Sequence, residues 1–516
     1  MSRRIPYSWP LVVLVVCLLP VVAMAQTGPL APSPQPSATV ERGGSLLDEY
    51  TSERDGSFAW KVVRSYVGSG EREGAIGFAI DLTSQTWRGL PDGGGETDFP
   101  AWTHMLQVVV PDEVRHDTAL LLVGGGQRQA VAPPGLQEEL WTIALATGSI
   151  VAAVPNVPNQ PLSLPDEDGT LGDIRFEDDL LAESWMLAKR TGDPSWVIHL
   201  AMVESVLAAM DAVQQFASSE EGGGHEIGGF VVSGASKRGW TAWLTAAVDD
   251  RVRGIIPMVI DTLNLPETMR HHYGAYGFFA PAIGDYAGRN LMQELDTPEG
   301  LMLRRIVDPY LFRHRLTMPK FVLNTTGDQY FLPDTPRYWI DDLPGDTRLR
   351  VVQNLDHAID RSLDAIFSAI GFYEAILNDV ELPDVGIEVV EEGDDAVEWL
   401  VSVRIPDDRV TLRRLTLWQG TNPTARDFRE ETIGKPFRMR MLLPEGDGPN
   451  QGKYRVRVEK PDTGYTAFFV EHRYDVRGQQ MPLVFTTQVQ IIPDVLEHAF
   501  EGHGRDGDEA RVPADP

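Results

Sequence analysis

Cysteine is almost absent from this sequence. Its 516 residues contain one, Cys17, which lies within an apolar run that begins at Leu11 and ends at Ala23. Basic residues precede the run and small residues, ending at Ala25, close it, which is the pattern of a signal peptide. We therefore expect residues 1–25 to be removed on export to the periplasm or the cell exterior. The mature chain would hold no cysteine, which excludes disulfides, thiolate metal sites and a cysteine nucleophile.

The export signal leaves two points open. Arg3 and Arg4 precede the apolar run, so the twin-arginine route competes with the general secretory route. An uncleaved anchor competes with cleavage, but the run is short for a bilayer span and contains Pro20. We expect no stable membrane span once the signal is cleaved.

Positive charge is also scarce, since 45 Lys and Arg residues face 75 Asp and Glu residues, for a net charge of −30. A surface this acidic repels the phosphates of nucleic acids and anionic lipid headgroups. We therefore expect no nucleic-acid partner. The sequence contains no Walker loop, HExxH motif, EF-hand loop or dinucleotide-binding fingerprint. His271 and His272 are adjacent, but no third ligand follows at metal-binding spacing, so we expect neither a metal nor an organic cofactor.

The rest of the chain divides into a leader, an α/β part, a β part and a tail. Residues 26–45 are rich in Pro, Ser, Gly and Ala and predict a flexible leader. Residues 46–380 alternate apolar strands with helical periods, which predicts a mostly parallel sheet flanked by helices. An aromatic and Gly-rich insertion at about 261–310 would cap the carboxyl edge of that sheet. Residues 383–495 show the alternation and turns of a β-sandwich-like domain, and residues 501–516 predict a disordered tail.

The α/β part begins with three predicted strands over 58–67, 76–88 and 104–111. Its later strands are expected over 118–123, 149–154, 228–233, 252–260, 320–324 and 348–353. Helices are expected over 136–147, 177–190, 199–216, 238–248, 336–342 and 358–378.

One motif joins a strand to a helix through a serine. The stretch VVSGASKRGW places Ser236 between Gly234 and Gly239, after a predicted strand. A nucleophile elbow has this form, because its tight turn strains the backbone of the serine and leaves no room for bulky neighbours. The usual pattern is G-x-S-x-G, and Arg238 stands where its second glycine belongs. An ordinary strand-to-helix turn is the alternative interpretation.

An acid and a base follow the serine in the order found in α/β-hydrolases. Asp328 and His357 each follow a predicted strand. An imidazole can take a proton from the Ser236 hydroxyl, which is a poor nucleophile by itself, and a carboxylate can orient that imidazole. Asp261 and Asp334 are alternative acids, because one ends the preceding strand and the other follows the loop of Asp328.

Backbone N–H groups would hold the oxyanion of such a reaction. The first belongs to Lys237, directly after the serine, and the second to a glycine loop in which Gly125 and Gly126 are the best candidates. The alternative is that the glycine loop only makes a tight turn.

Charged residues accompany the serine. Lys237 and Arg238 either bring positive charge to the reacting centre, favouring an acidic substrate, or form salt bridges. Arg238, Glu177 and His271 are candidates for substrate contacts, although acids at the start of a helix also stabilise its dipole.

Several stretches of the chain together resemble the PhoPQ-activated pathogenicity-related protein family, over nearly everything from Leu46 to Pro493. They are LTSQTWR (82–88), PNVPNQP (155–161), SGASKRGWT (233–241), TGDQYF (326–331), GYTAFFVE (464–471) and FTTQV (485–489). The resemblance implies an exported protein of the α/β-hydrolase fold with a β-rich C-terminal domain, associated with virulence or secreted signalling. Some relatives are likened to dipeptidyl peptidases, which hold the terminal ammonium of a substrate with paired acids.

Three functional hypotheses follow. The first is a Ser-His-Asp hydrolase that cleaves an ester or amide bond in a small-molecule ester or a peptide. The second is a secreted binding or signalling protein on a hydrolase scaffold. The third is a carbohydrate esterase, because the stretch GASK at 234–237 also resembles glucuronoyl esterases.

Overall fold

The computed structural model describes residues 44–89, 96–393, 395–445 and 452–500. The predicted signal peptide, almost all of the predicted leader and the predicted tail lie outside these residues. None of the helices in the described ranges is long and apolar enough to cross a membrane.

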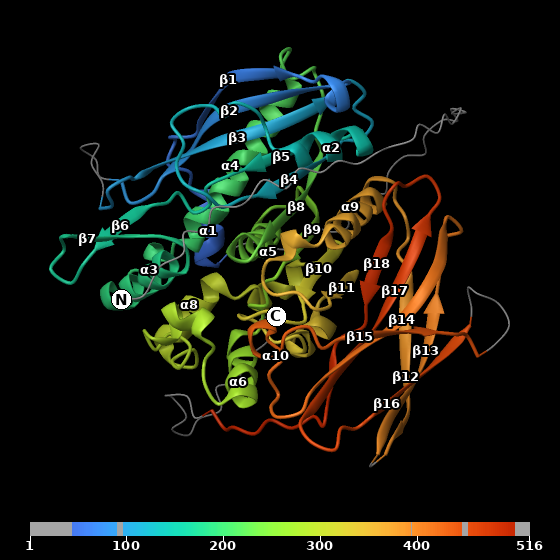
Figure 1. Cartoon of the computed structure of the whole chain (residues 1–516). Helices are drawn as coiled ribbons and strands as arrows, with labels where there is room; N and C mark the ends of the chain where they lie inside the picture. The colour runs from blue at the N-terminus through green and yellow to red at the C-terminus, as the bar shows by residue number, and fades with distance from the viewer. Residues whose placement is uncertain (1–43, 90–95, 394, 446–451, 501–516) are drawn as a thin grey trace. The chain divides into compact units, whose positions relative to one another are not determined.

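Antiparallel strands open the fold, as the sequence predicts (Figure 1). They are β1 (Ala59–Val67), β2 (Ala75–Thr86) and β3 (Ala101–Pro111). A short helix, α1 (Leu46–Ser52), precedes them, and Ser45 caps its first turn through the amide of Asp48. The side chain of β3 residue Gln107 accepts a hydrogen bond from the backbone N–H of Gln137, just before the first helix of the α/β part.

Six parallel strands form the centre of the sheet in the order β5-β4-β8-β9-β10-β11. They are β4 (Thr118–Val123), β5 (Val151–Val154), β8 (Gly229–Ala235), β9 (Val252–Met258), β10 (Lys320–Thr325) and β11 (Thr347–Val352). Most of their residues are buried, because helices cover both faces of the sheet. The predicted mostly parallel sheet is confirmed.

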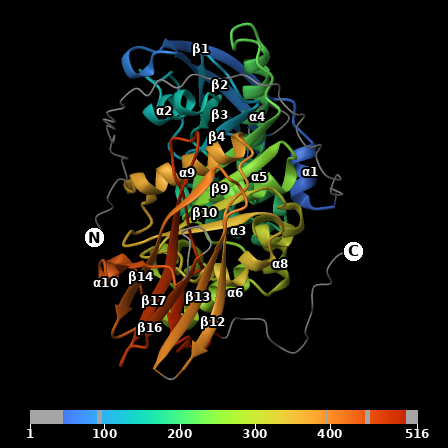
Figure 2. The same ribbon diagram turned by 90° about the vertical axis from the view of Figure 1, so that its right-hand side faces the viewer.

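Successive side chains of these strands enter two different hydrophobic cores. In β4, Ala119 and Leu121 pack with α4 (His199–Ser218) and α5 (Lys237–Val248), whereas Leu120 packs with α2 (Glu138–Thr147) and α9 (Leu363–Leu377). Figure 2 shows these two helix pairs on opposite sides of the sheet. The alternation follows from the two-residue period of a strand.

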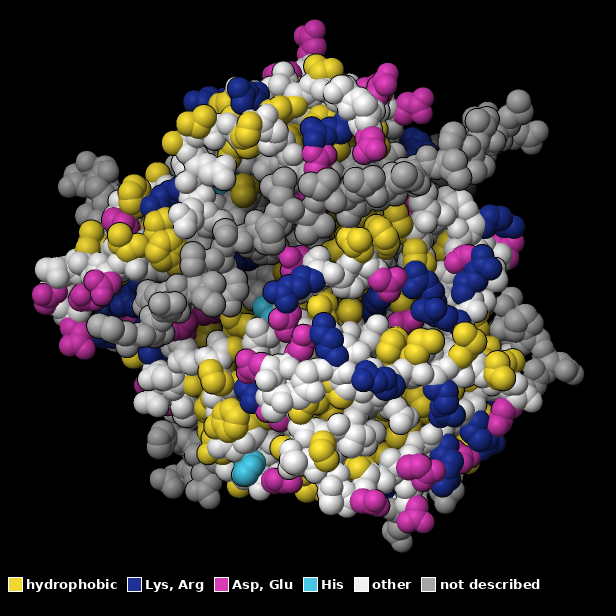
Figure 3. Space-filling model, viewed as in Figure 1, with side chains coloured by type: hydrophobic (Ala, Val, Ile, Leu, Met, Phe, Trp, Pro, Cys, Tyr) yellow, Lys and Arg dark blue, Asp and Glu magenta, His cyan; other side chains and the backbone are white. Residues whose placement is uncertain are grey.

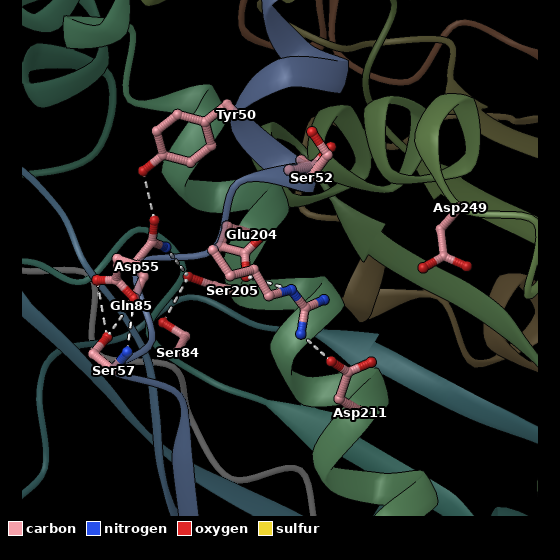
Figure 4. A network of polar contacts seen from close by, with 12 residues as sticks. Tyr50, Ser52, Asp55, Ser57, Ser84, Gln85, Glu204, Ser205, Asp211 and Asp249 are labelled. Atoms are coloured by element: carbon pink, nitrogen blue, oxygen red, sulfur yellow. Dashed lines mark hydrogen bonds and ion pairs between the residues drawn. The ribbon is translucent and has the colours of Figure 1, made fainter. Parts of the chain in front are cut away.

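A buried polar network fastens α1 to β2 and α4 (Figure 4). The hydroxyl of Tyr50 donates to Gln85 Oε1 at 2.7 Å, and Gln85 Nε2 donates to the carbonyl of Ala201 at 2.6 Å. Ser84 continues the network to His104, whose Nδ1 lies 2.9 Å from the carbonyl of Pro155 at the end of β5. Burial lowers the pKa of His104 to about 4, so its imidazole is neutral.

Two insertions extend the α/β part. The first, between β5 and α4, holds the hairpin of β6 (Leu162–Pro165) and β7 (Leu171–Arg175) and then α3 (Glu177–Thr191). The second, between β9 and β10, is the predicted insertion and holds α6 (Leu265–Tyr276), α7 (Gly284–Ala287) and α8 (Pro298–Val307).

The helix predicted over 336–342 is absent from the described chain. Two short 3₁₀ helices, Thr335–Tyr338 and Ile340–Asp342, stand there instead, and Trp339 separates them with φ −153°. The Trp339 indole is buried and donates to the carboxylate of Asp261. Burial of this ring breaks the helical path that the local sequence favours.

The C-terminal strands are antiparallel, as predicted, and form two layers. The strands β12 (Asp384–Glu392), β13 (Ala396–Arg404) and β16 (Lys453–Glu459) make a sheet of their own. The others are β14 (Val410–Asn422), β15 (Arg438–Leu442), β17 (Tyr465–Val476), β18 (Leu483–Thr486) and β19 (Gln490–Ile492). Between the layers, Trp399 packs on Phe468 with ring centroids 4.7 Å apart.

The second layer is continuous with the central sheet, which the predicted boundary near residue 383 did not anticipate. Strand β18 pairs with β11 through Leu349 and Thr486, so the sheet runs from β1 to β15 in the described residues. Figure 3 shows Lys and Arg side chains gathered beside acidic ones over the C-terminal strands. Ion pairs such as Arg455–Glu445 and Arg457–Glu459 account for this mixture.

Asp364, in the first turn of α9, holds two arginines at the junction of β11 and β17. Its carboxylate contacts Arg350, which is 1% exposed, and accepts a hydrogen bond of 2.9 Å from Arg473. Burial alone would raise the pKa of Asp364, but the two guanidiniums outweigh it and hold that pKa below its ordinary value of 3.8.

We predict that Asp364→Asn lowers the free energy of unfolding by about 1 kcal/mol at pH 7, because the buried Arg350 keeps only the charge of Glu471 nearby, while the 47% exposure of the Asp364 side chain screens part of the loss. Since the carboxylate stabilises the fold above its unfolded pKa, the difference from wild type shrinks as the pH falls below 3.8. Urea unfolding at several pH values measures it. Asp81→Asn is the control, because Asp81 pairs with Lys61 at 3.3 Å and both side chains are exposed; an equal loss there contradicts the prediction.

Candidate active site

Ser236 lies at a strained turn between β8 and α5. Its φ is 55° and its ψ is −132°, a conformation that few residues with a side chain adopt. Its N–H donates to the carbonyl of Met258 at 2.8 Å, which fixes the turn against β9. The side chain stays partly exposed at the carboxyl edge of the sheet.

The two glycines of the motif meet across this turn. A Cβ atom on Gly234 would lie 2.6 Å from the backbone of Arg238, and one on Gly239 would lie 2.8 Å from the carbonyl oxygen of Gly234. Gly239 therefore permits the close helix–strand contact that the second glycine of the usual motif provides, one position later. The Arg238 departure from the pattern leaves the turn intact.

His357 and Asp328 are brought together by the ends of β11 and β10. Nδ1 of His357 lies 2.7 Å from Oδ2 of Asp328. The other carboxylate oxygen, Oδ1, accepts backbone hydrogen bonds from Tyr330 at 2.7 Å and Phe331 at 3.3 Å. These bonds aim the carboxylate at the imidazole, and the ring of Tyr330 packs 4.3 Å from that of His357.

The second imidazole nitrogen of His357 is available. Nε2 is buried and has no hydrogen-bond partner within the described part of the chain. Because a carboxylate accepts the proton on Nδ1, the neutral ring carries its free lone pair on Nε2. The pair can therefore accept a proton at Nε2 while Asp328 stabilises the resulting imidazolium.

The two alternative acids face other partners. Asp261 is fully buried and accepts hydrogen bonds from the indole of Trp339 and, at 3.4 Å, from Asn324. Its burial, and after it the nearby charges of Asp328 and Asp334, raise the pKa of Asp261 well above its ordinary range. This carboxyl group is thus held toward its neutral form.

Asp334 belongs to a buried ion cluster that continues through Arg426 to the half-exposed Asp494. Its carboxylate lies 2.9 Å from Nε2 of His271 and 2.6 Å from Arg426, and all three side chains are fully buried. Burial would raise the pKa of Asp334, but the charges of His271 and Arg426 outweigh it and hold that pKa far below its usual range. His271, a candidate for substrate contact, is enclosed with it, and its Nδ1 lies 3.0 Å from the hydroxyl of Tyr338.

The cations beside Ser236 are paired rather than free. Arg238 donates to both carboxylate oxygens of Glu177, at 2.6 and 2.8 Å, and to the carbonyl of Val157. Lys237 lies 3.0 Å from Glu177 and 3.1 Å from Asp178. Burial would raise the pKa of Glu177, but Arg238 and Lys237 outweigh it and hold that pKa well below its usual range. Of the two interpretations of these cations, the salt-bridged one describes the structure.

The glycine loop after β4 approaches the same cluster. A Cβ atom on Gly125 would lie 2.9 Å from the guanidinium of Arg238, so a larger residue there would displace that guanidinium from its partners. The carbonyl of Gly125 accepts from the N–H of Asn156 at 2.8 Å. The N–H groups of Gly125, Gly126 and Lys237 have no acceptor among the residues that the structure describes. They are available to an oxyanion.

Two residues of the site, Gln160 and Tyr330, were not predicted from the sequence. Gln160 accepts from the N–H of Glu177 at 2.8 Å and donates to its carboxylate at 2.6 Å, so it orients the partner of Arg238. Tyr330 covers His357. Both lie in stretches that carry the family resemblance, PNVPNQP and TGDQYF, which is the signal that would have pointed to them.

A parallel sheet in this strand order, a strained serine after β8 and an Asp–His pair after β10 and β11 define a protein of the α/β-hydrolase fold. The model of the PhoPQ-activated pathogenicity-related protein family matches residues 47–429, and the chain belongs to this family. The resemblance predicted from the sequence is confirmed.

Similar proteins include autocrine proliferation repressor protein A of Dictyostelium discoideum, which is 31% identical over 485 residues, 90% of this chain and 95% of the relative. Among solved structures, acetyl xylan esterase 1 from Thermoanaerobacterium sp. is 13% identical, with a TM-score of 0.42 over 64% of this chain and 93% of that one. A glucuronoyl esterase from Solibacter usitatus is also 13% identical, with a TM-score of 0.37 over 64% and 91% of the two chains. These likenesses to solved structures concern the fold alone.

We predict that Glu177→Gln lowers the free energy of unfolding by about 1 kcal/mol at pH 7, since Arg238 loses its counter-charge while Lys237 keeps Asp178, and the 41% exposure of the Glu177 side chain screens part of the loss. The pKa of Glu177 is lowered in the fold, so its stabilisation is present above the ordinary value of 4.5 and is lost as the pH falls. Urea unfolding of both proteins between pH 7 and 3.5 is the measurement.

Asp285→Asn is the matched control. Asp285 lies in the same cluster, but its ion pair with Arg289 is long, at 3.8 Å. Burial, followed by the charges of Asp179 and Asp178, raises its pKa, so neutralising it is expected to leave stability unchanged or higher. A destabilisation equal to that of Glu177→Gln contradicts the pairing argument.

Proposed function

We propose that this protein is a serine hydrolase that cleaves an ester or amide bond through Ser236, His357 and Asp328. The observation that carries the proposal is the 2.7 Å contact of Asp328 with Nδ1 of His357, which leaves Nε2 buried and unpartnered in the described chain. The strained turn at Ser236 is its second support. Each residue has a distinct task in the reaction.

In the proposed reaction, Nε2 of His357 takes the proton of the Ser236 hydroxyl as its oxygen attacks the substrate carbonyl. The N–H groups of Lys237 and of Gly125 or Gly126 hold the oxyanion. The imidazolium then gives its proton to the leaving alcohol or amine, and an acyl group remains on Ser236. Water, deprotonated by the same imidazole, releases the acid and restores the serine.

The ion pairs beside Ser236 affect which substrate charge the site can accept. Arg238 is fully engaged by Glu177 and Val157, so it offers no free guanidinium to an anionic substrate. This favours uncharged esters over glucuronoyl-type esters within the proposed activity. The carboxylates at 177–179 are half-buried and ion-paired with Lys237, Arg238, Arg175 and Arg289. A peptide bound there through its amino terminus, the competing substrate, therefore has to displace these pairs.

A secreted binding or signalling role is the second candidate. A cavity of about 670 Å³ opens between β11 and β18 on one side and β12 and β13 on the other, and Ser236, His357 and Asp328 are not among its lining residues. The name of the Dictyostelium discoideum relative, a proliferation repressor, also fits signalling. The family description would connect either role to pathogenicity.

We predict that a fluorophosphonate probe labels the wild-type protein at Ser236 and that Ser236→Ala abolishes the label. His357→Ala is expected to slow labelling and ester hydrolysis by about 10³-fold or more, because the serine loses its base. Gel fluorescence and mass mapping of the labelled peptide measure this. A panel of uncharged esters, glucuronate esters and dipeptide amides then separates the substrate classes.

Ser233→Ala is the control, because Ser233 is buried and donates to the carbonyl of Ile256 at 2.8 Å; it is expected to label normally. Among the acids, Asp328→Asn should lower kcat by about 10⁴-fold, whereas Asp261→Asn should keep kcat within about threefold, since Asp261 is bonded elsewhere. If the probe does not label wild-type protein at Ser236, the hydrolase proposal is wrong and the binding role is favoured.

We also propose that the protein is exported and begins at Gln26 after signal cleavage, in accord with the sequence of residues 1–25. Expression of the full chain in a Gram-negative host should yield periplasmic or secreted protein whose intact mass lacks these residues. Protein that retains Met1 in the cytoplasmic fraction contradicts export. A block of the twin-arginine translocase distinguishes the two routes.

A further inference from the structure

A segment of the C-terminal β region reaches both loops that carry the proposed acid and base. We call residues 426–437, between β14 and β15, the clamp segment. It includes the one-turn helix α10 (Glu430–Ile433). Its shape is held internally by Asp427, which accepts hydrogen bonds from Arg429 at 2.9 and 2.6 Å and from Thr432 at 3.1 Å.

The first contact of the clamp segment lies next to Asp328. The N–H of Glu430 donates to the carbonyl of Gly327 at 3.0 Å, and the N–H of Gly327 donates to the carbonyl of Leu355 at 3.0 Å. A Cβ atom on Gly327 would lie 2.9 Å from Cβ of Glu430. The backbone before the acid is therefore enclosed between the clamp segment and the loop of His357.

The second contact fixes the loop of His357 itself. The side-chain amide of Asn354 makes a reciprocal pair with Phe437, accepting from its N–H at 2.9 Å and donating to its carbonyl at 3.0 Å. Asn354 has φ 54°, and its own N–H donates to the hydroxyl of Thr326 at 2.8 Å. One residue thus joins the clamp segment, the acid loop and the base loop.

The third contact is the buried ion pair of Arg426 with Asp334, at 2.6 Å. Asp334 ends the loop that begins at Asp328, and His271, on α6, completes the cluster at 2.9 Å. Because neither charge reaches water, separating them is costly. The clamp segment is therefore anchored at both ends and at its middle.

We propose that the clamp segment is a positioning element for the proposed catalytic pair, so that the C-terminal β region sets the alignment of Asp328 with His357. This inference rests on the proposed function for its catalytic part. Acid and base come from two separate loops. Among the residues that the structure describes, the clamp segment is the part outside 46–380 that bonds to both loops. Misplacing a reacting group by about 1 Å costs about 10²-fold in rate.

Asn354→Gly is the principal test. Glycine accepts the positive φ of this position, so the variant removes the amide pair with Phe437 without straining the backbone. Glu430→Pro is the second variant, because it deletes the N–H that bonds Gly327 while proline suits the first position of a helix. Arg429, the preceding residue, already has the extended backbone, φ −57° and ψ 135°, that proline requires.

Both variants are compared with Thr421→Val, which removes the 2.8 Å contact of Thr421 with Thr466 between β14 and β17 and touches neither loop. Ester hydrolysis gives kcat and KM, and amide hydrogen exchange by mass spectrometry follows residues 326–331 and 354–358. We expect kcat to fall about 10–100-fold with KM within about threefold for the two clamp variants. Exchange in both loops should accelerate, and Thr421→Val should change neither quantity.

The proposal is overturned by unchanged exchange in both loops, or by accelerated exchange with a wild-type kcat. An equal loss of kcat in Thr421→Val also overturns it, since the effect is then general destabilisation. If the wild type shows no Ser236-dependent hydrolysis, the proposed function fails, and the exchange measurement still decides whether the clamp segment holds the two loops.

Discussion

Parallel pairing of β8 with β9, of β9 with β10 and of β10 with β11 determines where Ser236, Asp328 and His357 lie. Parallel strands end at one common edge, so loops that are far apart in sequence meet there. Ser236, Asp328 and His357 each follow one of these strands. The buried, apolar character of the strands is what allows helices to cover both faces and leaves this edge as the place for polar chemistry.

Much of this arrangement was predictable because its signals are local. The apolar runs gave the parallel strands, and small residues around Ser236 gave the strained turn that its φ of 55° confirms. The family was predictable from short shared stretches. The choice of Asp328 as the leading acid rested on its place after a strand. Its carboxylate lies 2.7 Å from Nδ1 of His357, and its catalytic role stays a proposal.

Other features depend on contacts between distant residues and have no local signal. The pairing of Leu349 with Thr486 joins the C-terminal strands to the central sheet, and no pattern near either residue encodes its partner. Burial of Trp339 overrides the helical preference of its neighbours. That Gly239 serves as the second glycine of the elbow is visible only in its close approach to Gly234. The pairing of Arg238 with Glu177 is likewise visible only in the folded structure.

The single strand pairing between β11 and β18 also determines how this chain can be divided. Cutting the protein near residue 383 would remove β18 and make β11 an unpaired edge strand, and such an edge can pair with other chains and cause aggregation. In the separated C-terminal fragment, β18 would pair with β17 on one edge and have no partner strand on the edge that β11 occupies in the whole protein. The two halves therefore are not modules that recombination could exchange freely, and evolution of the α/β part is tied to the strands that follow it.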